Sequence, residues 1–433
     1  MPAPADGSGM SAATPPAGLR LRRGDVVAVA LPPGEAWLGI ASAAWAAEAS
    51  LLPVDHRLPE PAERDLLTDG RPTVIVSSEG WQRVPSGRPA DPGVALIVPT
   101  SGSLGRPRLV ELARTAVEAA VASSLRALAA ESGDGWVSCL PFAHIGGLLV
   151  LLRGLLGGAP LLFRGPAELE PVAGFPFASV VPTQLVRALD AGVDLRGYRT
   201  LLVGGGGVEA ALRERATAAG APCVVTYGLT QSCGGVVYDG LPLPGASVRV
   251  GEGGEIQLGG PTLLRGYRDG SAAGLTEDGW LPTGDAGRLD GDGRLHVHGR
   301  LDDLIVSGGE NVWPGDVEAA LRSHPAVADC AVFGRLDPSW GQRVVAAVVP
   351  RDRAVPPTLE ALRDHVGALL GRQKAPRELV LVESLPRTAL GKPQRAGLAL
   401  HLPEPPGEAD DARDRGDTGG TRVAGDGRGQ PRP

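Results

Sequence analysis

The chain has 433 residues, which is too long for one ordinary hydrophobic core, so we expect two or three domains. Its 49 acidic residues outnumber its 42 basic ones, and the net charge of -7 argues against a nucleic-acid partner, which would need a basic surface stripe. Only two of the basic residues are lysines, Lys374 and Lys392, so a lysine carries more information in this chain than an arginine does.

Both ends of the chain have the composition of disordered segments. Residues 1–20 are rich in alanine, glycine and proline and lack the basic and apolar regions of an export signal. Residues 402–433 are charged and poor in apolar side chains. We therefore expect a disordered leader, a disordered tail and a cytoplasmic location.

Residues 21–299 are predicted to form an α/β N-terminal domain with a mostly parallel sheet, because strand and helix patterns alternate along it. Short apolar runs bounded by turn residues predict strands at 24–31, 73–78, 94–100, 200–203 and 223–227. Helical patterns are found at 36–51, 117–128, 144–163 and 208–219. The third of these is the most apolar, but Arg153 and several glycines interrupt it, so it predicts a buried helix and no membrane span.

The pattern changes after residue 240, where short alternating strands with glycine turns predict a β-rich section. Residues 300–401 are predicted to form a small α+β C-terminal domain. Its expected helices and strands lie at 314–323, 328–334, 343–350, 358–370 and 378–383. No Gly/Ser linker separates the two domains, so we expect a hinge rather than a flexible tether.

The stretch "LIVPTSGSLGRPRLVEL" (residues 96–112) places a loop of Ser, Thr and Gly directly after an apolar strand. Glycines let backbone N–H groups converge on an anion, hydroxyls add donors, and a basic residue adds charge. The spacing is not that of a Walker loop, which requires Lys followed by Ser or Thr after its second glycine. By itself the stretch fits a phosphate loop and an ordinary strand-to-loop turn equally well.

Together with other blocks, this loop resembles the phosphate-binding loop of the adenylate-forming acyl-CoA synthetase superfamily. The blocks that follow in the family's order are "LPFAHIGG", "LLVGGGG", "TYGLTQSCGG", "GEIQLGGPTLLRGY", "GWLPTGDAGRLDGDGRLHVHGRLDDLIVSGGENVWPGDVEAAL" and "LPRTALGKPQR". The resemblance covers residues 24–396. Within the superfamily, "VPTQLVRAL" and "CGGVVYDGLPLPGASVRV" are most similar to the o-succinylbenzoate–CoA ligases of menaquinone biosynthesis.

The resemblance implies an AMP-forming acid–CoA ligase that uses ATP, Mg²⁺ and coenzyme A. Lys392 would reach the carboxylate and the α-phosphate together, and Thr230 would hold the α-phosphate. His144 would lie beside the acyl pocket, and Asp302 would be the hinge of a mobile lid. The residues implied to bind ATP are Thr100, Ser101, Gly102, Ser103, Gly105, Arg108, Gly205, Gly206, Tyr227, Gly228, Asp285 and Arg300.

The chain departs from the family's pattern at three positions. Gln231 stands where the family has a glutamate that helps to hold the Mg²⁺ of ATP, so we expect weak metal binding there. Leu104 replaces a hydroxyl residue of the loop, and Arg108 replaces a lysine. Three alternatives remain open: a ligase for another aryl or alkyl acid, transfer to a carrier-protein thiol, or a non-catalytic protein that binds nucleotide or acyl-adenylate.

Overall fold

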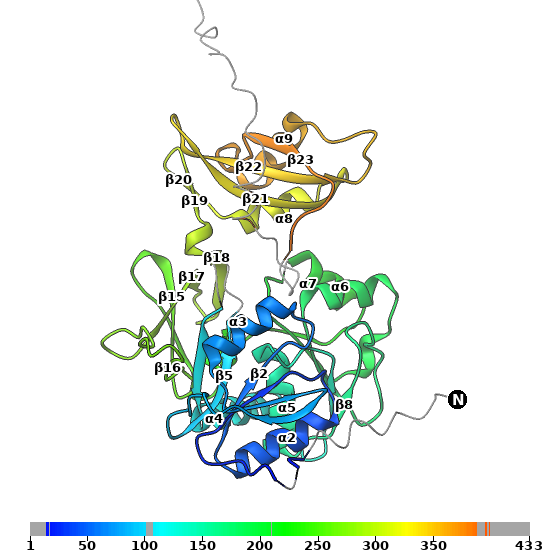
Figure 1. The fold of residues 1–433 in the computed structure, drawn as a ribbon. Helices are drawn as coiled ribbons and strands as arrows, with labels where there is room; N and C mark the ends of the chain where they lie inside the picture. Colours follow the sequence, from blue (N-terminus) through cyan, green and yellow to red (C-terminus); the bar gives the residue numbers. More distant parts are fainter. Residues whose placement is uncertain are drawn as a thin grey trace, which may run out of the picture.

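The protein is described by a computed structural model over residues 14–16, 18–100, 107–208, 210–387, 395 and 398. Figure 1 shows a larger body built from residues up to Arg300 and a smaller body built from the residues that follow. The 3-10 helix η4 (Leu301–Asp303) connects them. This is the predicted division into a large α/β part and a small α+β part.

The first sheet has seven strands in the order β16-β6-β5-β2-β1-β3-β4. Its central strands β1, β2, β3 and β5 are parallel, and its outer strands are antiparallel to their neighbours. A sheet with parallel central strands is what the alternating pattern predicts. The bounds are β1 (Val26–Val29), β2 (Ser50–Pro53), β3 (Val74–Ser77), β4 (Gly80–Arg83), β5 (Val94–Pro99), β6 (Leu109–Ala113) and β16 (Gly266–Tyr267).

The second sheet also has seven strands, in the order β13-β12-β11-β10-β9-β7-β8. Strands β7 to β11 run parallel, and β12 and β13 turn back as antiparallel strands. The bounds are β7 (Trp136–Ser138), β8 (Leu161–Phe163), β9 (Phe177–Val180), β10 (Thr200–Val203), β11 (Cys223–Leu229), β12 (Gly234–Tyr238) and β13 (Leu241–Pro242).

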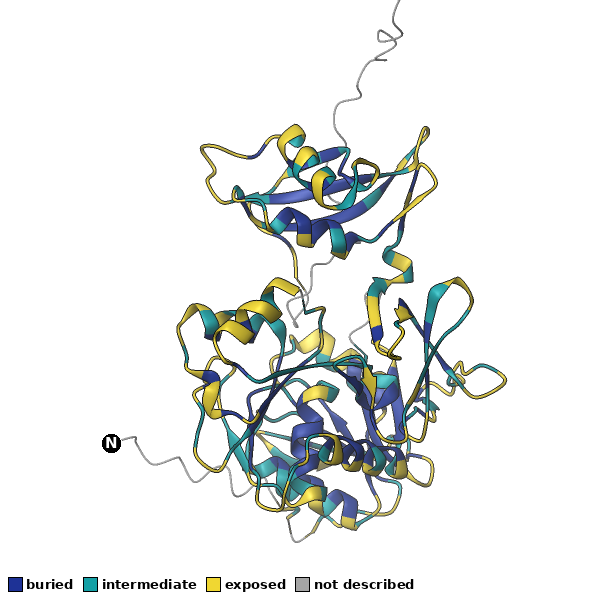
Figure 2. Cartoon of the chain, turned by 180° about the vertical axis from the view of Figure 1, so that it is seen from behind, coloured by how far each residue is buried: buried dark blue, intermediate teal, exposed yellow. Residues whose placement is uncertain are grey.

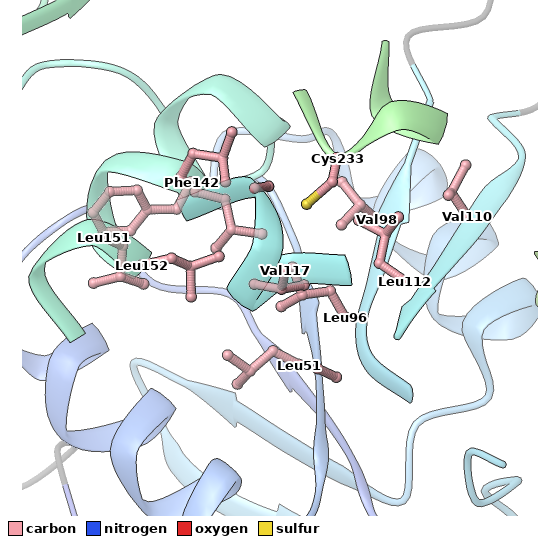
Figure 3. Packing of buried hydrophobic residues seen from close by; sticks show 14 of the residues in the cluster. Leu51, Leu96, Val98, Val110, Leu112, Val117, Phe142, Leu151, Leu152 and Cys233 are labelled. Atoms are coloured by element: carbon pink, nitrogen blue, oxygen red, sulfur yellow. The ribbon is translucent and has the colours of Figure 1, made fainter. Parts of the chain in front are cut away.

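Helix α5 (Ile145–Gly157) lies at the centre of the large body, as the apolar run predicts. Its residues Leu151 and Leu152 pack in one cluster with Leu96 of the first sheet and Cys233 beside the second (Figure 3). Burial falls outward from this core, and the outer helices are exposed on one face (Figure 2). The other helices of this body are α2 (Glu35–Ala46), α3 (Glu60–Gly70), α4 (Arg114–Ala127), α6 (Pro182–Asp190), α7 (Ala210–Ala218), η1 (Leu195–Gly197) and η2 (Thr230–Ser232).

Two predicted helices are too long. The helix expected at 36–51 ends at Ala46, because Glu48 has a φ of 51° and the fully buried strand β2 begins at Ser50. The helix expected at 144–163 ends at Gly157, and Gly158 has a φ of 67°, a left-handed conformation that favours glycine and ends helices. Among the described residues, no helix is both long and apolar enough to cross a bilayer.

The third sheet is antiparallel, with the order β14-β15-β17-β18, and it is the predicted β-rich section. The fourth sheet, with the order β20-β19-β22-β21 and β23 beside β22, forms the small body with α8 and α9. The bounds in the third sheet are β14 (Ser247–Val250), η3 (Glu252–Gly254), β15 (Glu255–Gly259), β17 (Leu281–Leu289) and β18 (Leu295–Arg300). Those in the small body are β19 (Ile305–Ser307), β20 (Glu310–Val312), α8 (Pro314–Arg322), β21 (Val327–Asp337), β22 (Gly341–Pro350), α9 (Leu359–Leu370), η5 (Arg372–Lys374) and β23 (Glu378–Leu381).

Candidate active site

The predicted phosphate loop starts where β5 ends. The backbone N–H of Thr100 donates to the carbonyl oxygen of Arg108 at 2.9 Å, and the backbone N–H of Arg108 donates to Thr100 Oγ1 at 3.0 Å. These bonds bring the start and the end of the loop together beside the paired strands β5 and β6. The loop residues predicted to bind phosphate lie outside the described residues: Ser101, Gly102, Ser103 and Gly105.

The side chain of Arg108 is exposed and lies over an aromatic ring from a distant part of the chain. Its guanidinium carbon is 3.4 Å from the centroid of the Tyr267 ring, and its Nη2 donates to Ser271 Oγ at 2.7 Å. No carboxylate of the described residues lies within ion-pair distance of this guanidinium. The positive charge of Arg108 therefore has no direct carboxylate partner among the described residues, so the guanidinium is available to bind a phosphate group.

Tyr227, Asp285 and Arg300 meet where β11 approaches the third sheet. Tyr227 Oη donates to Asp285 Oδ2 at 2.9 Å, and Arg300 Nη1 lies 3.5 Å from Asp285 Oδ1. Asp285 and Arg300 also face each other across the β17–β18 pair. Three residues predicted to bind ATP are thus brought together, with the carboxylate held between a phenol and a guanidinium.

The charges of this cluster follow from burial and from its acids. Burial raises the pKa of Tyr227, and the negative charge of Asp285 raises it further. Burial alone would lower the pKa of Arg300, but the carboxylates of Asp285 and Asp302 outweigh it and the net shift is upward. Tyr227 is therefore a neutral hydrogen-bond donor and Arg300 a permanent cation at physiological pH.

Two different structural features favour glycine at the predicted positions 205, 206 and 228. Gly205 follows β10 with a φ of 75°, a conformation that favours glycine, and Gly206 continues the same turn. A Cβ on Gly228 would lie 2.0 Å from the carbonyl oxygen of Gly234 on the paired strand β12. Close strand pairing alone thus requires glycine at position 228, whereas the turn after β10 leaves backbone accessible.

Thr230 and Gln231 lie in η2, directly after β11. The backbone N–H of Leu264 donates to the carbonyl oxygen of Gln231 at 2.7 Å, and Gln231 Nε2 lies 3.5 Å from Tyr267 Oη. Within the described ranges, no three His, Cys, Asp or Glu side chains gather as a metal site would need. A single amide oxygen is a weak ligand, so Gln231 fits a Mg²⁺ that arrives with the phosphates of ATP.

His144 precedes the first turn of α5 and is partly buried. Burial lowers its pKa, the charge of Asp55 raises it and that of Arg57 lowers it again, with a net downward shift. Arg57 pairs with Asp55 through Nε at 2.9 Å and Nη2 at 2.7 Å. His144 is therefore a neutral ring at physiological pH, as a group beside an apolar acyl pocket would be.

Arg153 is a site candidate that the sequence pattern presented only as an interruption of an apolar run. Its side chain is only 3% exposed, and its Nε and Nη2 donate to Ser124 Oγ at 3.2 and 2.9 Å. Its guanidinium carbon lies 4.4 Å from the Trp136 ring centroid, and its Nη1 has no hydrogen-bond partner. Among the described residues no carboxylate pairs with it, which is unusual because buried charges are normally paired. The signal in the sequence was a charged residue inside an apolar run, nine residues after His144.

The predicted hinge lies between the two bodies. Asp302 in η4 accepts from Arg300 Nη2 at 3.2 Å. Its neighbour Asp303 accepts from Arg395 Nη1 at 2.9 Å, and Arg395 also binds both carboxylate oxygens of Glu318 on α8. Lys392, three residues earlier in sequence, lies outside the described residues.

Comparisons with known proteins agree with this geometry. The family model "AMP-binding enzyme" matches residues 79–268, and "AMP-binding enzyme C-terminal domain" matches residues 316–392. A probable 2-succinylbenzoate–CoA ligase of Mycobacterium tuberculosis is 43% identical over 362 residues, covering 78% of this chain and 91% of the relative. The chain belongs to the AMP-binding enzyme family.

Other members of the family extend the comparison. A 2-succinylbenzoate–CoA ligase of Bacillus licheniformis is 36% identical and covers 70% of this chain and 69% of its own. The solved o-succinylbenzoate–CoA synthetase of Bacillus subtilis, in complex with its acyl-adenylate intermediate, has a TM-score of 0.79 and 25% identity and covers 90% of this chain and 91% of its own. The same enzyme was also solved with ATP and a magnesium ion. The family, the fold class and the class of acid–CoA ligases predicted from the motifs are confirmed.

Proposed function

We propose that this protein activates o-succinylbenzoate with ATP and transfers the acyl group to coenzyme A, as a step of menaquinone biosynthesis in the cytoplasm. The observation that carries the proposal is the 43% identity over 91% of a relative that bears this activity in its name. Two features of the site support the proposal. Tyr227, Asp285 and Arg300 form a cluster that could receive a nucleoside, and Arg108 at the phosphate loop is a cation without a carboxylate partner among the described residues.

The reaction needs positive charge because two anions must meet. An oxygen of the substrate carboxylate attacks the α-phosphorus of ATP, the bond to the β-phosphate oxygen breaks, and pyrophosphate leaves with the electron pair. The thiol sulfur of coenzyme A then attacks the acyl carbon, AMP leaves, and the thiol proton passes to solvent. Cations and N–H donors placed where charge develops stabilise the first transition state.

The residues of the site would divide this work by the part of ATP that each would contact. Tyr227, Asp285 and Arg300 would receive the adenosine, with the Asp285 carboxylate as acceptor for the ribose diol. Arg108 would meet the outer phosphates, while Thr230 and Lys392 would act at the α-phosphate. A compact ammonium suits Lys392, because it can serve two oxygens on different groups, whereas a planar guanidinium requires fork geometry.

Arg153 favours a substrate with a second carboxylate. o-Succinylbenzoate has two, and only one is activated, so the other needs a partner where it is buried. Arg153 is a buried cation without a carboxylate partner among the described residues, on α5, the helix that follows His144. An acid with one carboxylate would leave that charge unpaired.

The test measures pyrophosphate release from ATP and Mg²⁺ with o-succinylbenzoate and with a panel of monocarboxylic aryl and alkyl acids. We expect release with o-succinylbenzoate at least tenfold above the others, and a thioester after coenzyme A is added. Arg153→Met should abolish this preference, since a charged hydrogen bond contributes about 1.5–3 kcal/mol. Equal rates with monocarboxylic acids would assign the site to another acid–CoA ligase.

A further inference from the structure

Tyr267 belongs to none of the predicted sets of site residues, yet it contacts two members of them. We propose that the 267–271 turn is a positioning element of the adenylation reaction, in which Tyr267 and Ser271 hold Arg108 in place to bind the phosphates of ATP. This inference rests on the proposed function for its chemistry, but it concerns ATP affinity and can be tested separately.

The turn is fixed to the core of the large body. Tyr267 is 8% exposed and pairs with Val110 across β16 and β6. The next residue, Arg268, is 2% exposed, and its guanidinium donates to the carbonyl oxygens of Gly70 and Pro89 at 3.1 Å each. The phenol ring therefore stands on a rigid support beside the strand that leaves the phosphate loop.

The two contacts restrain the guanidinium of Arg108 in different ways. The centroid of the Tyr267 ring lies 3.4 Å from the guanidinium carbon, which fixes its plane, and Ser271 Oγ accepts from Nη2 at 2.7 Å, which fixes its rotation in that plane. The backbone N–H of Tyr267 donates to the carbonyl oxygen of Ser271 at 3.2 Å, so one closed turn supplies both contacts. An arginine has several freely rotating bonds, and restraining them in advance lowers the entropy cost of binding a ligand.

The charge of Arg108 stays available to a ligand. Both partners in the turn are uncharged, and no described carboxylate lies within ion-pair distance of Arg108. Asp269 within the turn is exposed and forms no ion pair with Arg108, and its pKa is lowered first by its hydrogen bonds from Ser271 and more weakly by the charge of Arg108. Gln231, which reaches Tyr267 Oη at 3.5 Å, is uncharged as well. A carboxylate at position 231 would bring a negative charge to the tyrosine on which Arg108 stacks, so the neutral glutamine and the stacked arginine suit each other.

The test compares ATP affinity, measured by titration calorimetry on the full chain without acid, in a double-mutant cycle. Tyr267→Leu removes the ring, Tyr267→Phe keeps it, and each is made in the natural and in the Arg108→Met background. Tyr267→Leu should weaken ATP binding about threefold to tenfold in the natural background, the range of a cation–π contact. In the Arg108→Met background, Tyr267→Leu should change the ATP affinity less than about twofold. In the natural background, Tyr267→Phe should also change the affinity less than about twofold, because the ring is kept.

An equal loss in both backgrounds, or no loss with the fold intact, would overturn the proposal. Ser271→Ala, at an exposed position, gives a second measurement in the same two backgrounds and decides the matter if Tyr267→Leu fails to fold. Wild-type protein that binds ATP but releases no pyrophosphate with o-succinylbenzoate would end the proposed function alone, because the coupling between Arg108 and the turn is read from affinity.

Discussion

Gln231 stands where the resemblance implies a glutamate that helps to hold Mg²⁺. Gln231→Glu should lower the Mg²⁺ concentration that gives half-maximal pyrophosphate release by about threefold or more, because a carboxylate binds Mg²⁺ more strongly than an amide oxygen. The measurement is a Mg²⁺ titration at saturating ATP and acid. Gln82→Glu, at an exposed position on β4, is the matched control. An unchanged midpoint would place Gln231 outside the metal site.

His144 predicts a change in stability with pH. Its folded-state pKa lies below the ordinary value, so the unfolded chain takes up a proton more readily and stability is lost as the pH falls through about 6.5 towards the folded value. His144→Gln cannot take up this proton. Melting temperatures between about pH 7.5 and pH 5.5 should therefore fall more for the natural protein than for the variant. Parallel curves would mean that His144 is not held neutral by the fold.

At this scale the sequence predicted residues within motifs and missed those that act through distant contacts. Tyr227, Asp285 and Arg300 were predicted separately, and the structure brings them together through β11, β17 and β18. Arg153 lies inside an apolar run and Tyr267 at the end of a glycine-rich block, and neither was among the predicted site residues. Their contacts come from other strands and helices, which the local pattern does not contain.

Among the elements, the β11–β12 pair gives the sharpest stability prediction. Gly228→Ala would place a Cβ 2.0 Å from the carbonyl oxygen of Gly234, in backbone that has no flexible side chain to move aside. We expect it to lower the free energy of unfolding by about 1–3 kcal/mol, the usual range for overpacking. Gly207→Ala is the control, because a Cβ at that position would have no heavy atom within 4 Å. Equal denaturation midpoints for the two variants would contradict the clash.

Strands were predicted more closely than the ends of helices. The strand expected at 200–203 is β10 (Thr200–Val203), because its apolar run is bounded by turn residues on both sides. The helix expected at 36–51 wrongly includes the first residues of β2, because the alanine-rich sequence continues unbroken across the turn at Glu48. Alanine favours helix, but the buried place of β2 in the first sheet depends on its neighbours β1 and β5.

In the whole molecule, Arg395 contacts both α8 and η4, and Lys392 lies three residues before it in the sequence. Arg395→Met keeps the bulk but leaves Glu318, which is 3% exposed, without its bidentate partner. Glu318 keeps its ion pair with Arg322 at 3.3 Å and its hydrogen bond from the backbone N–H of Val332, so we expect a loss of about 1.5–3 kcal/mol of stability, the range of a charged hydrogen bond. Pyrophosphate release should fall further than the rate at which coenzyme A consumes preformed acyl-adenylate, because only the first step is proposed to use Lys392.

The control for this variant is Arg353→Met, which breaks an exposed pair with Glu383. That change should leave both rates and the stability within the small effect of a surface ion pair. Equal losses in the two half-reactions for Arg395→Met would show that Arg395 stabilises the small body without positioning the segment before it.

The division into a large α/β part and a small α+β part follows from the sequence, since strand and helix patterns change at residues 240 and 300. The network from Arg300 to Asp302 and from Asp303 to Arg395 does not follow from it. Each of these side chains fits an ordinary surface charge in sequence, and only the path of the chain around η4 brings them close.

Whether this protein forms an acyl-adenylate can be measured as a time course of pyrophosphate release from wild-type protein with ATP, Mg²⁺ and o-succinylbenzoate, before and after coenzyme A is added. We expect a burst of about one equivalent of pyrophosphate without coenzyme A, because the acyl-adenylate stays bound, and steady release with a thioester product once coenzyme A is present. ATP binding without pyrophosphate release, with this or any other acid, would show a nucleotide-binding protein that does not catalyse the reaction.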